Sequence, residues 1–466
     1  MISNNIVEQA QGVFLWVILV VNYLRGGLRN NDDYSDLLQR LNDLPDDLEE
    51  YFKYMLQTIE DMYWESTTRI FRTVIAAEQS LPLLGFSFLD QEMGDPGYAV
   101  AMQSKHLSNG THERICQRSR TRLNARCRDL LYVTDNKAEN GVFRYQVDFL
   151  HRTVRDFFLD SNVLEEMVQQ RTTKKFDPHL LLCKVMLALI KTSYTNEIYS
   201  EKDKHNLFLA ERLMHYAHSV EGTFIQFEGT ATDQMHQKSL VEVFCILDNL
   251  ERTNSYRFGS TSNSLPPMKR RRTNREPLDV RTFLASAIQA RLSLYVQERL
   301  RKEPQEILLK VGRPLLDYAL RPDSGAPQET SGLEQGPVAP ILRVLLDFGA
   351  KPNLRGSGYK KDTPWELFLE FCYENRVRGK DFAFMENIGA AMEIMIAHGA
   401  RVDGTFKLSE RLACEFAEVV EHLSIPPHSV DRIRDIIQKR DGIRWFLWNI
   451  ISLVQRWIEV MRAFLQ

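Results

Sequence analysis

Three sequence motifs that would mark a self-sufficient enzyme are missing from this chain. It has no Gly-x-x-x-x-Gly-Lys-Ser/Thr loop, no Gly-x-Ser-x-Gly turn and no His-Glu-x-x-His pair. The first motif would cradle nucleotide phosphates, the second would present a serine nucleophile, and the third would bind a metal ion. We therefore expect a non-enzymatic chain that cannot hydrolyse ATP alone and that has no cofactor and no metal site.

Cysteine pairs and targeting signals are also missing. There is no Cys-x-x-Cys pair and no secretory signal, and the formal net charge of -3 gives no overall attraction to nucleic acid or anionic lipid. We expect buried thiols in a reducing compartment, the cytoplasm by default and the nucleus as the alternative. The scattered cysteines are Cys116, Cys127, Cys183, Cys245, Cys372 and Cys414.

Long apolar runs are scarce as well. The strongest run, residues 12–24, is shorter than the roughly 20 residues that a membrane span needs, so we expect a buried helix. A short interfacial anchor beside Arg25 and Arg29 is the less favoured alternative. With 466 residues, 44% of them hydrophobic, the chain has material for two or three packed domains.

Helical periodicity dominates the first part of the chain and predicts a mainly α fold. Apolar residues over positions 37–59 follow the three-and-four spacing of a helix face, with a helix start at Pro45 and acids in its first turn. From Thr67 to Leu159 we expect a small winged-helix unit that ends in a β-hairpin. Its predicted parts are helices 67–78, 86–91 and 115–129, a turn at 81–83, a mobile loop at 92–109, and strands 130–135 and 142–149 around a turn with Asn140 and Gly141.

His151 lies where the alternating pattern of residues 142–149 gives way to the helical spacing of Val154, Phe157 and Phe158. The chain therefore turns from strand to helix at this histidine. Taken alone, a histidine among apolar residues is more often a core or capping residue than a ligand contact.

The segment around His151 resembles the end of the winged-helix subdomain in fungal NACHT-type (STAND, NLR-like) signalling ATPases. Residues 12–17, followed by the leucine repeat that ends near Leu48, are similar to the helical subdomain of the same family. The resemblance implies that His151 reaches the phosphates of bound ADP and helps to hold an inactive state. It also implies that the chain is the C-terminal part of a longer NACHT protein, a truncated gene model without the P-loop domain.

The middle of the chain contains apolar helical runs and then a polar break. Residues 163–251 predict a helical bundle, and residues 252–278 predict a flexible linker rich in Ser, Thr, Asn, Gly and Pro. Inside the linker, Lys269, Arg270, Arg271 and Arg272 have the form of a nuclear-import patch, although a solvated charge run is the commoner reading. No aromatic residues alternate with these charges, so we expect no nucleic-acid contact.

Residues 279–404 contain a degenerate repeat similar to the ankyrin repeat. Residues 312–320 and 361–367 resemble its Gly-x-Thr-Pro-Leu start, and the turns Gly349-Ala350 and Gly399-Ala400 resemble its end. We expect each glycine to form a left-handed helix cap and the following Asn or Asp to bond its own backbone. Segments 325–336 and 373–381 are expected to bulge, and helices 282–302 and 408–422 to cap the stack.

Residues 405–466 predict C-terminal helices, the last of them rich in tryptophan. Arg456, Glu459 and Arg462 interrupt that helix and argue against a membrane span. The helix would suit an interfacial membrane contact, a partner groove or, most commonly, docking within the chain. The segments read as a helical subdomain (1–66), a winged helix (67–162), a bundle, a linker, repeats and C-terminal helices.

Three functions fit these segments. In the first, the helical and winged-helix parts restrain the missing NACHT nucleotide domain, while the repeats sense a ligand or protein partner. In the second, the chain is a free-standing ankyrin-type scaffold without a nucleotide role. In the third, it is a diverged remnant without function.

Overall fold

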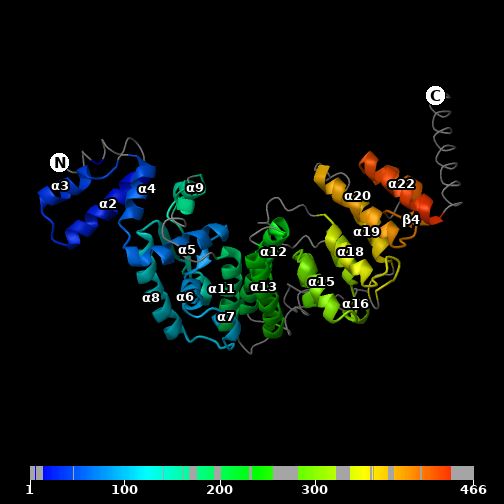
Figure 1. Ribbon diagram of the computed structural model, residues 1–466, viewed down its shortest axis with the longest axis horizontal. Coiled ribbons are helices and arrows are strands. Elements are labelled where there is room, and N and C mark those ends of the chain that lie inside the picture. Colours follow the sequence, from blue (N-terminus) through cyan, green and yellow to red (C-terminus); the bar gives the residue numbers. More distant parts are fainter. Residues whose placement is uncertain are drawn as a thin grey trace, which may run out of the picture. The chain divides into compact units, whose positions relative to one another are not determined.

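The computed structural model describes residues 6, 14–45, 47–139, 141–160, 162–166, 176–193, 201–229, 233–254, 282–321, 336–356, 359, 362–375, 382–409, 412–423 and 425–441. The chain is mainly α, as the sequence predicted (Figure 1). It divides into two compact units, residues 1–216 and 217–466. None of the helices in the described ranges has the length and apolar character required to cross a bilayer.

The apolar run near the N-terminus forms α2 (Phe14–Arg29), which is buried on one side only. Trp16 is fully buried, and its Nε1 donates to the carbonyl of Pro45 at 2.8 Å. Phe14, on the other side, is 75% exposed, and Ile18 and Val21 are exposed beside it. The expectation of a buried helix is therefore correct for one face of α2 and wrong for the other.

Two capped helices follow α2 and correct the predicted helix start. α3 (Tyr34–Asn42) begins with a capping box between Asp33 and Asp36. α4 (Leu48–Gln57) begins after Asp47, whose carboxylate accepts hydrogen bonds from the backbone N–H groups of Glu49 and Glu50. Because this side chain satisfies free N–H groups of the first turn, the helix starts there and not at Pro45.

The winged-helix unit has the predicted order of helices and hairpin. After the short turn η1 (Asp61–Tyr63), its elements are α5 (Trp64–Ala76), β1 (Leu81–Pro82), α6 (Leu83–Gly94), α7 (Tyr98–Ala101), α8 (Asn109–Cys127), β2 (Leu131–Asp135), η2 (Gly141–Phe143) and β3 (Tyr145–Phe149). α8 starts earlier than predicted because Ser108 Oγ caps it by accepting from the N–H of Thr111.

The sheet has one more strand than the sequence predicted. Its order is β1-β3-β2, antiparallel throughout, with Leu81 opposite Val147 and Val133 on the other side of Val147. Leu81 and Pro82 were expected to form a turn, and they form the edge strand β1. Proline is tolerated there because an edge strand does not need every backbone N–H for the ladder.

The helix after His151, α9 (Arg152–Asp160), joins the winged helix to α4 through aromatic rings. The ring centroid of Phe158 lies 4.4 Å from the ring centroid of Phe71 on α5 and 5.9 Å from that of Phe149 on β3. Phe157 lies 5.3 Å from Phe52 on α4. The two consecutive phenylalanines therefore hold α4, α5 and β3 together, and both are buried.

The loop predicted at residues 92–109 is fixed by two buried charged residues. Glu92 lies in α6 and accepts from the N–H groups of Gly97 and Ala99 at 3.0 and 2.6 Å. Lys191 of α11 (Pro178–Thr192) donates to three carbonyls, those of Ala99, Val100 and Met102. The expectation of a mobile loop is therefore wrong for residues 92–102, and α11 packs on α5, α6 and α7 as part of this unit.

α12 (Glu201–Phe227) crosses the division between the two units. Its first half belongs to unit 1, where Arg212 donates to the carbonyl of Ser80 at 3.0 Å and Tyr216 to that of Ala77 at 3.1 Å. The division at Tyr216 falls inside the segment predicted as one bundle. α13 (Asp233–Asn254) continues to Asn254, so the first residues of the predicted linker are helical.

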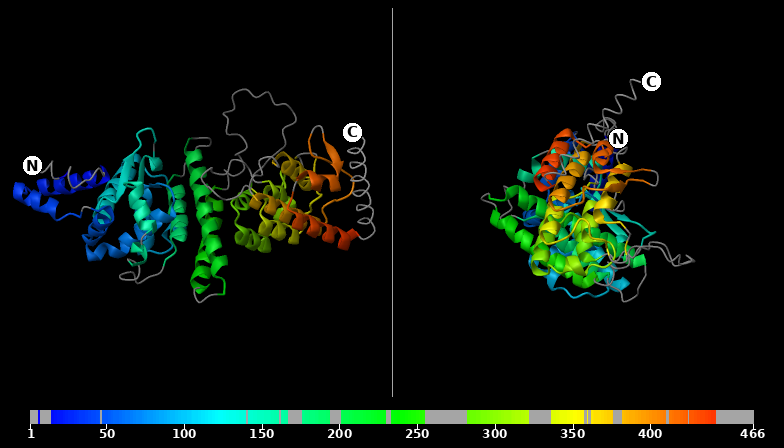
Figure 2. Two further views of the ribbon diagram at one scale, coloured as in Figure 1. Left: turned by 90° about the horizontal axis from the view of Figure 1, so that it is seen from above. Right: turned by 90° about the vertical axis from the view of Figure 1, so that its right-hand side faces the viewer.

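Beyond α13, unit 2 is built from helix pairs that follow one another in chain order (Figure 2). One row of contacting helices is α14, α17, α19 and α21, and the second row is α15, α18, α20 and α22. Their bounds, with the short α16, are α14 (Phe283–Gln289), α15 (Ser293–Lys302), α16 (Glu306–Leu309), α17 (Leu315–Leu320), α18 (Ala339–Asp347), α19 (Pro364–Asn375), α20 (Phe382–Ala397), α21 (Phe416–Leu423) and α22 (Pro427–Asp441).

The sequence missed a β-hairpin within this stack. β4 (Thr405–Lys407) pairs with β5 (Ala413–Glu415), with Phe406 opposite Cys414, so the helix predicted from Leu408 begins only at Phe416. Cys245 is exposed, which corrects the expectation of buried thiols for that residue, whereas the other five cysteines are buried. The import patch 269–272, most of segments 325–336 and 373–381, and the C-terminal tryptophan-rich helix lie outside the described residues.

Candidate functional site

His151 caps the N-terminus of α9 and is exposed. Its Nδ1 accepts a hydrogen bond from the backbone N–H of Thr153 at 3.2 Å and lies 2.9 Å from the Thr153 hydroxyl. An N–H group near the start of a helix lacks a partner within the helix, and here the imidazole supplies one. The position predicted from the sequence is therefore correct, and the imidazole has a capping role as well as an accessible ring.

The cap also determines which nitrogen of His151 carries hydrogen. Because Nδ1 accepts from a backbone N–H, the neutral ring must carry its proton on Nε2. Nε2 is then a hydrogen-bond donor at the N-terminal end of α9, where the free N–H groups and the helix dipole favour anions. A phosphate oxygen is an acceptor that suits this position.

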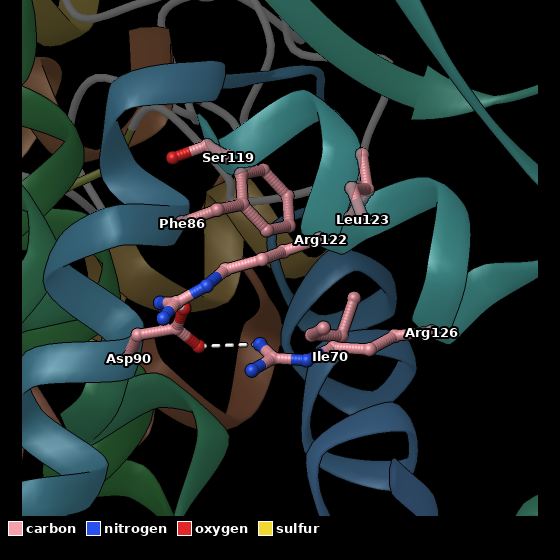
Figure 3. Close-up of a pocket in the computed structure, with 7 residues that line it drawn as sticks. All are labelled: Ile70, Phe86, Asp90, Ser119, Arg122, Leu123 and Arg126. Atoms are coloured by element: carbon pink, nitrogen blue, oxygen red, sulfur yellow. Dashed lines mark hydrogen bonds and ion pairs between the residues drawn. The ribbon is translucent and has the colours of Figure 1, made fainter. Parts of the chain in front are cut away.

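A small pocket of about 10 Å³ lies between α5, α6 and α8 (Figure 3). Asp90 of α6 bridges two arginines of α8, with 2.8 Å to Arg122 and 2.5 Å to Arg126. The rest of the lining comes from Ile70, Phe86, Ser119 and Leu123. A pocket of this volume has room for about one water molecule and none for a small-molecule ligand, so we assign it to helix packing.

The two Gly-Ala turns of the repeats have the same backbone geometry. Gly349 has φ +96° and Gly399 has φ +90°, both in the left-handed region. The Ala350 N–H donates to the Leu345 carbonyl and the Ala400 N–H to the Met395 carbonyl, each at 2.9 Å. These bonds complete a Schellman cap in each repeat, as the glycine and alanine pattern predicted.

Asn353 corrects the role expected for the polar residue after the turn. Its Nδ2 donates to the Gly399 carbonyl at 2.7 Å, and its Oδ1 accepts from the Arg401 N–H at 3.1 Å. The amide thus bonds the turn of the next repeat and not its own backbone. Because the partner is distant in sequence, no local pattern could show this contact.

Arg313 occupies the position, just before the proline, at which the start of an ankyrin repeat usually has threonine. Its guanidinium donates to Asp317 at 2.9 Å one helical turn later, and Arg321 donates to the same carboxylate at 2.6 Å. Asp317 is fully buried, and Arg313 is 5% exposed. In the second repeat the corresponding residue is Thr363, which forms a reciprocal cap with Glu366.

One cysteine lies close to a histidine in α8, but the pair does not fit nucleophilic chemistry. Cys116 Sγ is 3.6 Å from His112 Nε2. Burial raises the pKa of the Cys116 thiol to about 12 and lowers the pKa of His112, and both shifts oppose a thiolate–imidazolium pair. Within the described part of the chain, no group of three or more His, Cys, Asp or Glu side chains could hold a metal ion.

Sequence reasoning missed Glu221, which is 1% exposed in α12. Its carboxylate accepts from the N–H groups of Leu294 and Tyr295 at 3.0 and 2.8 Å and so caps α15. Burial raises the pKa of this carboxyl to about 7, and the backbone hydrogen bonds partly oppose the shift. No signal in the sequence links this residue to a helix that begins so much later.

The predicted site residues fall in different units of the described structure. His151 belongs to unit 1 and the Gly-Ala turns belong to unit 2. No curated protein and no solved structure matches the chain. Residues 52–199 match one family model, so that a domain of unknown function, DUF7791, extends from α4 to just beyond α11.

Proposed function

We propose that the chain is a non-catalytic regulatory and protein-interaction region of a NACHT-type signal-transduction ATPase. In this proposal the winged-helix part of unit 1 restrains a nucleotide-binding domain that this chain does not contain. His151 contacts a phosphate of the nucleotide held by that domain. The repeats of unit 2 bind a protein partner. That binding shifts the equilibrium between the restrained and the released nucleotide-binding domain.

The observation that carries the proposal is the exposed imidazole of His151 with Nδ1 occupied by Thr153. A donor that is fixed in direction by a cap loses little freedom on binding a phosphate oxygen. The aromatic contacts of Phe157 and Phe158 hold α9 against α4 and α5, so the imidazole is placed by a packed core. A histidine buried in the interior would have removed this reading.

A second candidate function is supported by the repeats alone. The Asn353 bridge and the two rows of stacked helices make unit 2 an ankyrin-like array, an architecture that presents surface for protein recognition and no catalytic geometry. On this alternative the chain is a free-standing scaffold, and unit 1 has no nucleotide role.

Binding in trans separates the two candidates. A P-loop domain from a fungal NACHT protein, purified with ADP or emptied of nucleotide, is titrated with the whole chain by calorimetry. The regulatory proposal predicts tighter binding to the ADP-loaded domain, by about tenfold or more, because one ADP contact comes from the chain. Equal affinity for both forms, or no binding to either, contradicts the proposal and leaves the scaffold function.

A further inference from the structure

α8 is the most basic helix among the described residues. It contains five arginines within 19 residues, followed by Arg128 at its C-cap, and its only acidic residue is Glu113. The arginines of α8 are Arg114, Arg118, Arg120, Arg122 and Arg126. A chain with a net charge of -3 has no general attraction for polyanions, so a local concentration of positive charge is the feature that matters.

The two sides of α8 differ sharply in character. Cys116, Ser119, Leu123 and Cys127 are buried and face α5 and α6. The opposite side is exposed and is mainly polar and basic, with the acidic Glu113, whose side chain is 52% exposed, at its edge. The exposed polar and basic residues are Arg114, Gln117, Arg118, Thr121 and Asn124, and the Arg122 side chain is 42% exposed beside them.

The one acidic residue of α8 is directed toward the hairpin. Glu113 accepts from the hydroxyl of Tyr145 on β3 at 2.9 Å, and Arg144 lies 3.9 Å from the same carboxylate. The guanidinium of Arg120 lies over the Tyr145 ring at 5.4 Å. These contacts fix the β2–β3 hairpin against α8 and partly neutralise Glu113, so the exposed face stays positive.

Two arginines of α8, Arg122 and Arg126, are held by an acidic residue on α6. Asp90 on α6 pairs with Arg122 and Arg126 and so holds the side of α8 that faces α6 (Figure 3). α8 is about 28 Å long at 1.5 Å per residue, and one α-helix fits the major groove of B-form DNA. An exposed face of Arg, Gln, Asn and Thr supplies donors for phosphates and for base edges.

We propose that the exposed face of α8, with the β2–β3 hairpin beside it, binds double-stranded DNA. Charge complementarity favours a polyphosphate backbone, and the amide side chains of Gln117 and Asn124 add groups that recognise bases. A-form RNA fits less well because its major groove is too narrow and deep for side chains to read. The residues of this site differ from His151 and from the repeats. The proposal departs from the expectation of no nucleic-acid partner, which rested on the whole-chain charge and the linker.

Fluorescence anisotropy with a duplex of about 20 base pairs tests the proposal over a range of salt concentrations. The whole chain should bind with a micromolar Kd at low salt, and the logarithm of the affinity should fall linearly with the logarithm of the salt concentration. The double variant Arg114→Ala/Arg118→Ala should bind about tenfold or more weakly, with a salt slope smaller by about two. Arg114→Lys/Arg118→Lys should keep most of the affinity, which shows that the face acts through charge.

A matched control removes the same charge elsewhere. Arg343→Ala/Lys351→Ala changes two exposed basic residues of unit 2 and should leave DNA binding unchanged. Any of three results overturns the proposal: no binding by the whole chain at low salt, equal affinity of the α8 and control variants, or competition by polyglutamate as strong as competition by DNA. The last result would assign the face to an acidic protein.

Discussion

The side-chain amide of Asn353 joins its own repeat to the carbonyl of Gly399 in the next one, at 2.7 Å. The same amide accepts from the backbone N–H of Arg401, so one residue satisfies two backbone groups of the neighbouring turn. Repeat arrays derive much of their stability from such contacts between neighbours. The bridge is therefore a direct means of testing whether residues 349–401 form a cooperative stack.

Asn353→Ala should lower the free energy of unfolding of unit 2 by about 1 kcal/mol, because two hydrogen bonds at an exposed position are lost. Urea denaturation of the whole chain, followed by circular dichroism, measures the change. Lys351→Ala, at an exposed residue of the same turn, is the control and should change the stability by less than about 0.5 kcal/mol. A similar effect of both substitutions would show that the bridge does not stabilise the stack.

Glu221 should make the stability of unit 2 depend on pH. Its folded-state pKa is about 7, above the ordinary value of 4.5, so between these pH values the folded state holds a proton that the unfolded state has released. The contribution of this group to stability therefore falls as the pH rises from 4.5 to 7, by about 3 kcal/mol at most.

The comparison with Glu221→Gln isolates this effect. The stability of this variant relative to wild type should rise across that pH interval, because glutamine stays neutral and mimics the protonated carboxyl. Urea denaturation at several pH values gives the difference. Glu374→Gln, at an exposed position of α19, is the control and should show no such trend. A constant difference between wild type and Glu221→Gln would exclude the proton linkage.

Phe157→Ala should loosen α4 from the winged-helix unit. The substitution removes a buried ring that lies 5.3 Å from Phe52, and the cavity should cost about 3–5 kcal/mol of unit 1 stability. The substitution should increase the rate of hydrogen exchange more in α4 than in α11, because Phe157 contacts α4. The control Leu159→Ala alters a side chain that is 55% exposed, and its effect should be small. Unchanged protection of α4 in Phe157→Ala would refute the joining role.

The sequence predicted the parts that depend on local patterns. The mainly α fold, the order of helices and hairpin in the winged-helix unit, and the left-handed glycines Gly349 and Gly399 all follow from periodicity and turn chemistry. It did not predict β1, because two residues carry no alternation and their pairing with β3 depends on a distant strand.

Two further contacts were missed for the same reason. Lys191 orders a polar loop from a helix far along the chain, and Glu221 caps α15 across a long separation, so neither contact has a local signature. The start of α4 was misplaced because Asp47, a better cap, outweighed Pro45. For the candidate site, the sequence located the turn at His151, but only the structure assigns Nδ1 to the cap and so the donor to Nε2.

The dissociation rate of ADP tests the role of His151 most directly. The chain is fused to a P-loop domain of a fungal NACHT protein, loaded with fluorescent ADP and chased with unlabelled nucleotide. With His151→Ala, ADP should leave about tenfold faster than from the parent fusion, because a phosphate contact is lost, while His106→Ala, at an exposed histidine elsewhere in unit 1, should leave the rate unchanged. Identical dissociation rates for the parent, His151→Ala and His106→Ala fusions would contradict the account.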